Sequence, residues 1–165
     1  MNILEKTLED IVFETDNETL YQRGLLIEGK KKRQVRIGNY GIADIVSVHR
    51  EHYGPCITVL VITITELKQL KVGMTAFLQA IRYAKGIDRY LSEVRKVKYS
   101  YKFRINLIGT DIDLGNEAFV YLSDLISNFD STQPGIGLVC YVMKINIDGV
   151  QFVEKDGFCL NNEGF

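Results

Sequence analysis

The stretch from Ile57 to Lys68, ITVLVITITELK, constrains the fold of this chain most, because a long β-branched and apolar run ends there in charged residues. β-Branched residues favour strands, and successive strand side chains point to opposite faces of a sheet. Glu66 and Lys68 therefore share one face with Ile64, while Leu67 points to the other. The sequence predicts a buried strand that ends with a carboxylate and an amine side by side.

A second strand upstream carries a lone carboxylate. In the stretch GIADIVSV, residues 41–48, Asp44 shares one face with Val46. A polar loop follows over residues 49–56. If the two strands form an antiparallel hairpin, Asp44 faces Glu66 when the turn centres halfway between them, at Pro55. The hairpin would then bring the two carboxylates together.

Two carboxylates from neighbouring strands form the hard oxygen site that Mg²⁺ prefers, with waters and a substrate phosphate completing its shell. A lysine beside the metal can orient a water for attack on phosphorus, while the cation neutralises charge developing on the phosphate. This is the outline of a phosphodiesterase site. The alternative is a strand end that frays into solvent, where an ion pair between Glu66 and Lys68 contributes about 0 to 1 kcal/mol.

An E-x-K tripeptide alone indicates little, because the chain contains a second copy. Glu28-Gly29-Lys30 has the same letters, but it lies at a glycine turn before a basic run, and no aspartate-bearing strand precedes it. We interpret that copy as a solvated turn, since exposed charges need no further explanation. The copy at Glu66 differs because an apolar strand leads into it and Asp44 lies in the strand before.

The rest of the chain predicts one mixed sheet with helices packed on its faces. An amphipathic helix is expected over residues 3–13, opened by a capping box of Asn2 and Glu5, with Glu9 on its polar side. Strands are expected at 21–28 and 33–37, before a turn at 38–41. A helix over 72–94 would carry an apolar stripe, with Gln79, Arg82, Tyr83 and Gly86 on the opposite side and Gly86 as an interruption.

Downstream, a short strand is expected at 104–108. Asn116 is expected to cap a helix that runs to about residue 129, and a strand over 136–147 would hairpin through Asp148-Gly149 into a strand at 150–153. The order of elements predicts an α/β chain, and its length of 165 residues with 46% hydrophobic residues suits a single domain over residues 1–165.

Composition and the cysteines bear on location. The three cysteines are odd in number and lack C-x-x-C spacing, so neither a disulfide framework nor a cysteine zinc site is indicated. No segment resembles a signal peptide or approaches about 18 uncharged apolar residues, so we expect a cytoplasmic protein without a membrane span. The net charge of −1 gives no global attraction to nucleic acid, although cations cluster at 30–33, at Arg36 and at 95–104.

Several other patterns are weaker. The stretch from Gly24 to Lys30 nearly matches a Walker loop, but Lys31 stands where Ser or Thr would hold Mg²⁺, so no nucleotide cofactor is expected. His49 and His52 lack the partners of a zinc site or a nucleophilic triad, and we interpret them as polar loop residues. Asp111 and Asp113 form a rival carboxylate pair or an ordinary connection. The basic run at 30–33 is either a solvated hairpin tip or a phosphate contact.

The order of Gly41-x-x-Asp44, ITITELK and Gln79-Ala80-x-Arg82-Tyr83 resembles the PD-(D/E)XK nuclease superfamily, which has the restriction-endonuclease-like fold, a three-layer fold with a central mixed β-sheet flanked by helices. The similarity spans residues 3–110. The first helix, the RQVRIGNYGIAD segment and the QAIRYAKGI helix look like the RecB-like and archaeal mismatch and single-strand nuclease branch. Ala43 stands where the superfamily's name-giving proline would be.

The resemblance implies a Mg²⁺- or Mn²⁺-dependent DNA endonuclease, in DNA repair, recombination or phage and mobile-element DNA processing. Its metal ligands would be Asp44, Glu66, the Leu67 carbonyl and, from the first helix, Glu9. Its catalytic residues would be Asp44, Glu66, Lys68, which positions the hydrolytic water, and Gln79 beside them. DNA contacts are expected at Lys31, Lys32, Arg33, Arg36, Arg82 and Tyr83.

Two other classes stay open at this point: a nuclease-fold DNA-binding or assembly protein whose site does not turn over, and a plain α/β structural domain. The strandedness of the substrate, DNA against RNA, and an internal against a terminal cut stay open too. A homodimer is expected only by resemblance, since small nuclease domains often work in pairs.

Overall fold

The computed structural model describes residues 5–127 and 135–155. In chain order its elements are α1 (Glu5–Glu14), α2 (Asn17–Gln22), β1 (Lys30–Arg36), the 3₁₀ turn η1 (Gly38–Tyr40), β2 (Ile42–Tyr53), β3 (Ile57–Leu67), β4 (Lys71–Val72), α3 (Met74–Arg89), the π-helical turn η2 (Tyr90–Val94), β5 (Ser100–Gly109), β6 (Asp111–Ile112), α4 (Glu117–Ser127), β7 (Ile136–Asn146) and β8 (Gly149–Lys155).

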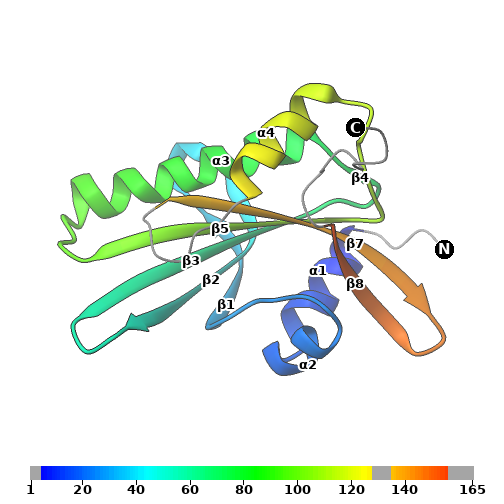
Figure 1. The fold of residues 1–165 in the computed structure, drawn as a ribbon, viewed down its shortest axis with the longest axis horizontal. Coiled ribbons are helices and arrows are strands. Elements are labelled where there is room, and N and C mark those ends of the chain that lie inside the picture. Colours follow the sequence, from blue (N-terminus) through cyan, green and yellow to red (C-terminus); the bar gives the residue numbers. More distant parts are fainter. Residues whose placement is uncertain (1–4, 128–134, 156–165) are drawn as a thin grey trace, which may run out of the picture.

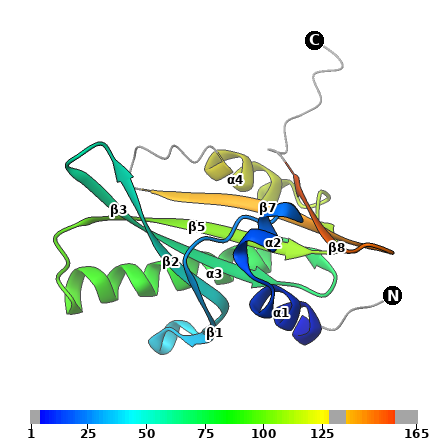
Figure 2. The same ribbon diagram turned by 90° about the horizontal axis from the view of Figure 1, so that it is seen from below.

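Six strands form one mixed sheet in the order β1-β2-β3-β5-β7-β8, and β4 pairs with β6 in a small second sheet. The strands β1, β2 and β3 form an antiparallel meander, β3, β5 and β7 are parallel, and β8 returns antiparallel to β7. Helices α3 and α4 cover one face, and α1 and α2 cover the other (Figures 1 and 2). The prediction of an α/β chain with a mixed sheet flanked by helices is confirmed.

Each face of the sheet has its own apolar core. On the α3 and α4 side, Ile64, Ile105 and Phe119 are fully buried. On the α1 and α2 side, Leu8 and Tyr141 are almost fully buried. Within the described residues, no helix combines the length and apolarity needed to cross a bilayer.

The hairpin of β2 and β3 has the predicted register. Its pairs run from Ile45↔Thr65 to Tyr53↔Ile57, so the turn centres on Pro55. The expected loop over residues 49–56 was too long, because β2 continues to Tyr53 and only residues 54–56 turn. Residues 49–53 belong to the strand because they pair with residues 57–61 of β3.

The segment between α1 and β1 contradicts the prediction of a strand at 21–28. Asp16 caps a short helix instead, because its carboxylate accepts hydrogen bonds from the N–H of Thr19 at 2.8 Å and from its hydroxyl at 2.7 Å. Lys30 begins β1, so the basic run lies within a strand and not at a hairpin tip. Asn2 and the expected helix start at residue 3 lie outside the described residues.

The helix α3 begins two residues later than predicted, because Val72 belongs to β4 and Gly73 precedes the first turn. Gly86 does not interrupt it. A Cβ on Gly86 would lie 2.6 Å from the Tyr40 ring, so glycine lets η1 pack against the helix. Tyr83 and Gly86, predicted to lie opposite the apolar stripe, are buried, because Tyr83 packs against Gly41 and Gly86 against Tyr40.

The elements after α3 have the predicted types, but β5 begins at Ser100, before the predicted start at residue 104, and β8 ends at Lys155, after the predicted end at residue 153. Asn116 caps α4, because its Oδ1 accepts a hydrogen bond from the Phe119 N–H at 3.0 Å. The strands β7 and β8 join through a turn at Asp148. The predicted end of α4 at residue 129 lies outside the described residues.

Candidate metal centre

Asp44 and Glu66 lie next to each other at the open end of the β2–β3 hairpin, away from its turn, and each carboxylate bonds to the backbone of the other strand. The backbone N–H of Asp44 donates to Oε1 of Glu66 at 3.3 Å, and the N–H of Leu67 donates to Oδ2 of Asp44 at 2.9 Å. The two carboxylates predicted to converge are therefore adjacent. The strand β3 does not fray at this end, since Glu66 is fully buried.

Burial leaves this pair electrostatically unsatisfied. It raises the pKa of Glu66 to about 8, and the Asp44 carboxylate adds to the shift, while the Lys68 amine opposes it. Burial also raises the pKa of Asp44, and the carboxylates of Glu5 and Glu9 in α1 contribute. In both groups burial is the largest cause of the raised pKa, and the Lys68 amine is the positive charge that opposes it.

Lys68 is the nearest cation to Glu66, with Nζ 3.9 Å from Oε2. That distance is too long for a hydrogen bond, and Oε2 has no hydrogen-bond partner among the described residues. Lys68 is partly exposed, and its backbone N–H donates to the Ile108 carbonyl at 2.8 Å, which ties this end of β3 to β5. The amine therefore lies beside the pair without pairing fully with it.

These residues fit a hard divalent cation. A buried carboxylate oxygen without a partner costs free energy that coordination would offset, and carboxylate oxygens are the ligands that Mg²⁺ and Mn²⁺ take. Asp44 and Glu66 supply two such ligands. Leu67, whose carbonyl the resemblance names as a third, lies between Glu66 and Lys68 with its side chain in the core.

The helix α1 forms one side of the site. Glu5, Glu9 and Asp44 line the same hollow, of about 750 Å³, together with the side chain of Gln34 from β1. Gln34 Nε2 donates to Glu9 Oε2 at 2.6 Å. Glu9 therefore faces the hollow into which Asp44 also opens, as the resemblance implies, whereas nothing in the sequence pattern singled out Gln34.

Gln79 and Tyr83 lie together on α3. Gln79 Nε2 donates to the Tyr83 hydroxyl at 2.7 Å, and Tyr83 is only 1% exposed. The Tyr83 ring packs against Gly41, where an added Cβ would lie 2.8 Å from it. The exposed Arg82 guanidinium lies 5.8 Å from the centre of the Tyr83 ring. These residues thus support the start of the Asp44 strand, and Arg82 is the one whose side chain is exposed.

The basic residues of β1 divide into two kinds. Lys31 donates to the carbonyl oxygens of Val12, at 2.8 Å, and Thr15, and so caps the C-terminal end of α1. Arg33 pairs with Asp10 at 2.9 Å. Lys32 and Arg36 are exposed. Two of the four β1 residues predicted to contact DNA therefore contact α1.

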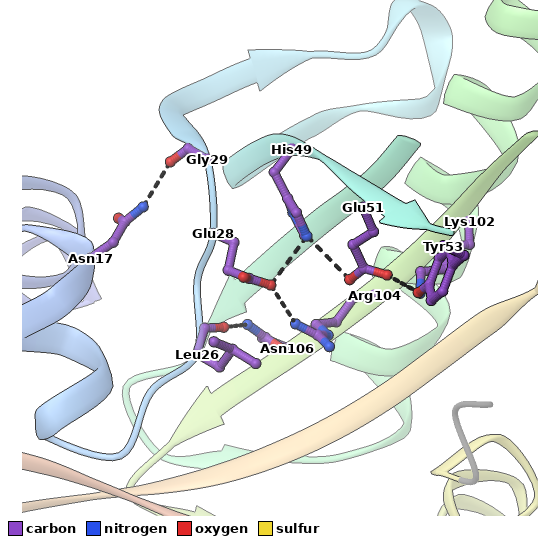
Figure 3. Close-up of polar contacts among 10 residues, drawn as sticks. All are labelled: Asn17, Leu26, Glu28, Gly29, His49, Glu51, Tyr53, Lys102, Arg104 and Asn106. Atoms are coloured by element: carbon purple, nitrogen blue, oxygen red, sulfur yellow. Dashed lines mark hydrogen bonds and ion pairs between the residues drawn. The ribbon is translucent and has the colours of Figure 1, made fainter. Parts of the chain in front are cut away.

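A second charged cluster consists of His49 and Glu51 from β2 and of Glu28, which precedes β1 (Figure 3). His49 Nε2 lies 3.1 Å from Glu28 Oε2 and 3.2 Å from Glu51 Oε1. Ligand atoms of these three residues lie within 4.8 Å of one another, close enough to share a metal ion. Glu28 is therefore in ion-pair contact and His49 lies in a strand, which corrects the interpretation of both as solvated turn or loop residues.

Cations of the chain already balance this cluster. Lys102 Nζ lies 2.6 Å from Glu51 Oε2, and Arg104 Nη1 lies 3.6 Å from Glu28 Oε2. The pKa of Glu51 falls to about 2, because hydrogen bonds from Lys102, Tyr53 and His49 outweigh the opposing effect of its burial. A divalent cation would compete here with two positive side chains, so we assign the cluster to the stability of the sheet.

Fold and site together define an α/β protein with a mixed six-stranded sheet and a fully buried Glu66 beside a partly buried Asp44. Comparison of the chain with protein-family models, with curated proteins and with solved structures found no significant match.

Proposed function

We propose that this chain is a Mg²⁺- or Mn²⁺-dependent DNA endonuclease that hydrolyses phosphodiester bonds at Asp44, Glu66 and Lys68. The observation that carries the proposal is the fully buried Glu66, whose Oε2 lacks a hydrogen-bond partner among the described residues and lies beside a second carboxylate. A carboxylate buried beside a second, partly buried one costs free energy that a bound cation would offset.

Each residue of the proposed site has its own role. Asp44 and Glu66 hold the cation, with the Leu67 carbonyl and Glu9 as further ligands, and Lys68 orients a water through its partly exposed amine. The cation, when bound, neutralises charge that develops on the phosphate and lowers the pKa of a bound water. Gln79 supports the site from α3 through its hydrogen bond to Tyr83.

The connectivity supports the finer proposal of a restriction-endonuclease-like fold. A helix leads into a three-stranded antiparallel meander, a second helix follows, and the next strand joins β3 in parallel. The two carboxylates lie on the second and third strands of that meander. This is the order that the resemblance over residues 3–110 implies.

For DNA contacts we propose the exposed cations Lys32, Arg36 and Arg82. Lys31 and Arg33 are left out because their charged groups contact α1. Tyr83 is left out because it is buried. Because α1 adds Glu5 and Glu9 to the site, long-range attraction of phosphates there is weak. Binding of DNA should therefore depend on the bound cation more than on a basic surface.

The direct test is cleavage of single-stranded, nicked and branched DNA by the purified chain with Mg²⁺ or Mn²⁺. We expect cleavage of at least one substrate and its loss with EDTA. The two E-x-K copies provide a matched pair, since Lys68→Met should abolish cleavage and Lys30→Met should not. A wild-type chain that stays inert on every substrate with both metals would contradict the enzyme proposal.

The same preparation separates the alternative of a DNA-binding protein that does not turn over. If DNA binding requires a divalent cation and is lost in Asp44→Asn, the enzyme proposal is supported. If DNA binds equally well with EDTA and in Asp44→Asn, the site does not act on DNA and the binding protein is favoured.

A further inference from the structure

Gln34 has an unusual backbone conformation at a position next to the candidate metal centre. Its φ is +51°, in the left-handed region that side chains other than glycine rarely adopt, and Lys96 is the other such residue among those the structure describes. Gln34 lies between the ladder pairs Arg33↔Ile45 and Val35↔Ala43. The register therefore places it opposite Asp44 while interrupting the pairing there.

The side chain of Gln34 makes one contact across to the first helix. Its Nε2 donates to Glu9 Oε2 at 2.6 Å, and both residues line the hollow that Asp44 shares. Oε1 of Glu9 has no hydrogen bond within the described part of the chain. The amide thus holds one carboxylate oxygen of Glu9 and leaves the other available.

The neighbours of Gln34 on β1 show why an amide matters. Lys31 and Arg33 also contact α1, but both bring a positive charge to it. Glu9 and Asp44 line the same hollow, so their two carboxylates repel each other. A neutral donor can hold Glu9 against that repulsion without supplying a cation that would compete with a metal ion.

We infer that Gln34 is a positioning residue: its strained backbone and amide hold Glu9 in the hollow that Asp44 also lines, so that Glu9 completes the metal site from α1. This inference deepens the proposed function and rests on it. Gln34 touches neither metal nor substrate and acts through Glu9. The contacts that fasten α1 to β1 at Lys31 and Arg33 keep the helix in reach of that amide.

The test is calorimetric titration of Mn²⁺ alone into the metal-free chain, compared with Gln34→Met, which keeps length and neutrality but removes the donor. We expect Mn²⁺ to bind about 10-fold more weakly to Gln34→Met, as is typical when the partner of a metal ligand is removed. Lys96→Met, at the other left-handed residue, is the matched control and should bind Mn²⁺ as the wild type does.

A double-mutant cycle separates positioning from general loosening of the fold. In a Glu9→Gln background, Gln34→Met should weaken Mn²⁺ binding no further, because the residue through which it acts is already changed. If the two changes are additive, or if Gln34→Met alone leaves Mn²⁺ affinity unchanged, the positioning role is overturned.

The outcome also distinguishes this inference from the proposed function. If the wild type binds Mn²⁺, and Asp44→Asn abolishes that binding while Gln34→Met does not weaken it, only the role of Gln34 is overturned. If the wild type binds no Mn²⁺ at all, the metal site itself fails, and the inference fails with it.

Discussion

Two acidic clusters share the strand β2 and differ in how their charge is balanced. Asp44 and Glu66 form the candidate metal centre, whereas Glu28 and Glu51 flank His49. Burial raises the pKa of Glu66 to about 8. In contrast, hydrogen bonds led by Lys102 lower the pKa of Glu51 to about 2, against the effect of its burial.

The comparison teaches that closeness of acidic groups does not by itself identify a metal site. The Glu28–His49–Glu51 cluster has the better ligand spacing, but Lys102 and Arg104 supply the charge that a cation would bring. Among the described residues, the ion-pair partner of the Asp44–Glu66 pair is Lys68, whose amine lies 3.9 Å from Glu66 Oε2. Missing positive charge, and not ligand spacing, marks the candidate site.

The largest expected effect is on the rate of DNA cleavage, when a carboxylate is neutralised in one cluster or in the other. Glu66→Gln removes a charged metal ligand and should lower the initial rate of DNA cleavage by at least about a hundredfold. Glu51→Gln, in the balanced cluster, should leave the rate within a few-fold of the wild type. Rates are measured at saturating Mg²⁺ on one substrate, with circular dichroism to confirm that both variants fold. Equal losses in the two variants would remove the distinction between the clusters.

The pH dependence of stability is the next effect. Because the pKa of Glu66 in the fold, about 8, lies above its ordinary value near 4.5, the folded metal-free chain binds a proton that the unfolded chain releases between those pH values. The stabilisation that comes from this bound proton is fully present below about pH 4.5. Between about pH 4.5 and 8 the free energy of unfolding falls by about 1.4 kcal/mol per pH unit.

Glu66→Gln mimics the protonated acid and should escape this loss. In EDTA the variant and the wild type should have similar unfolding free energies at pH 5, and the variant should become the more stable one towards pH 8. Denaturant unfolding at several pH values measures the gap. A gap that stays constant with pH would show that Glu66 is not held in the protonated form, and that its pair with Asp44 is already balanced.

The balanced cluster should respond to the loss of its cation. Lys102 is 1% exposed and lies 2.6 Å from Glu51 Oε2, so Lys102→Met leaves that carboxylate with fewer donors. We expect the free energy of unfolding to fall by about 2 kcal/mol, less than for a fully buried pair because Glu51 is partly exposed. The double variant Lys102→Met with Glu51→Gln should recover part of the loss. No recovery would mean that Lys102 acts through packing alone.

The sequence predicted the first cluster and missed the second for one physical reason. Asp44 and Glu66 lie on the two strands of one hairpin, so alternation and the position of Pro55 sufficed to pair them. Glu28 meets Arg104 only through the pairing of β3 with β5, which crosses over by way of α3. No local pattern carries the register of such a crossover.

The errors of local prediction have related causes. A strand was expected from residue 21, whereas the Asp16 side chain begins a helix at Asn17 by accepting a hydrogen bond from the Thr19 N–H. Periodicity placed Tyr83 opposite the apolar stripe of α3, but it cannot show that packing against Gly41 buries this side chain. Gln34 carried no sequence signal, since its role depends on a left-handed backbone that only the pairing of β1 with β2 and the approach of α1 reveal.

The smallest expected effect compares two adjacent lysines, one whose charge contacts another part of the fold and one whose charge is exposed. Lys31 donates to the last carbonyl groups of α1, and partial burial lowers its pKa, whereas Lys32 is exposed. Lys31→Met should lower the free energy of unfolding by about 1 kcal/mol, because the helix end loses its cation and its donor. Lys32→Met should leave unfolding unchanged and weaken DNA binding, with a smaller dependence on salt. Thermal unfolding and DNA titration at two salt concentrations measure both. If Lys31→Met weakens DNA binding as much as Lys32→Met without a loss of stability, Lys31 contacts phosphate and not α1, and a side chain's partners in the fold would not predict its role.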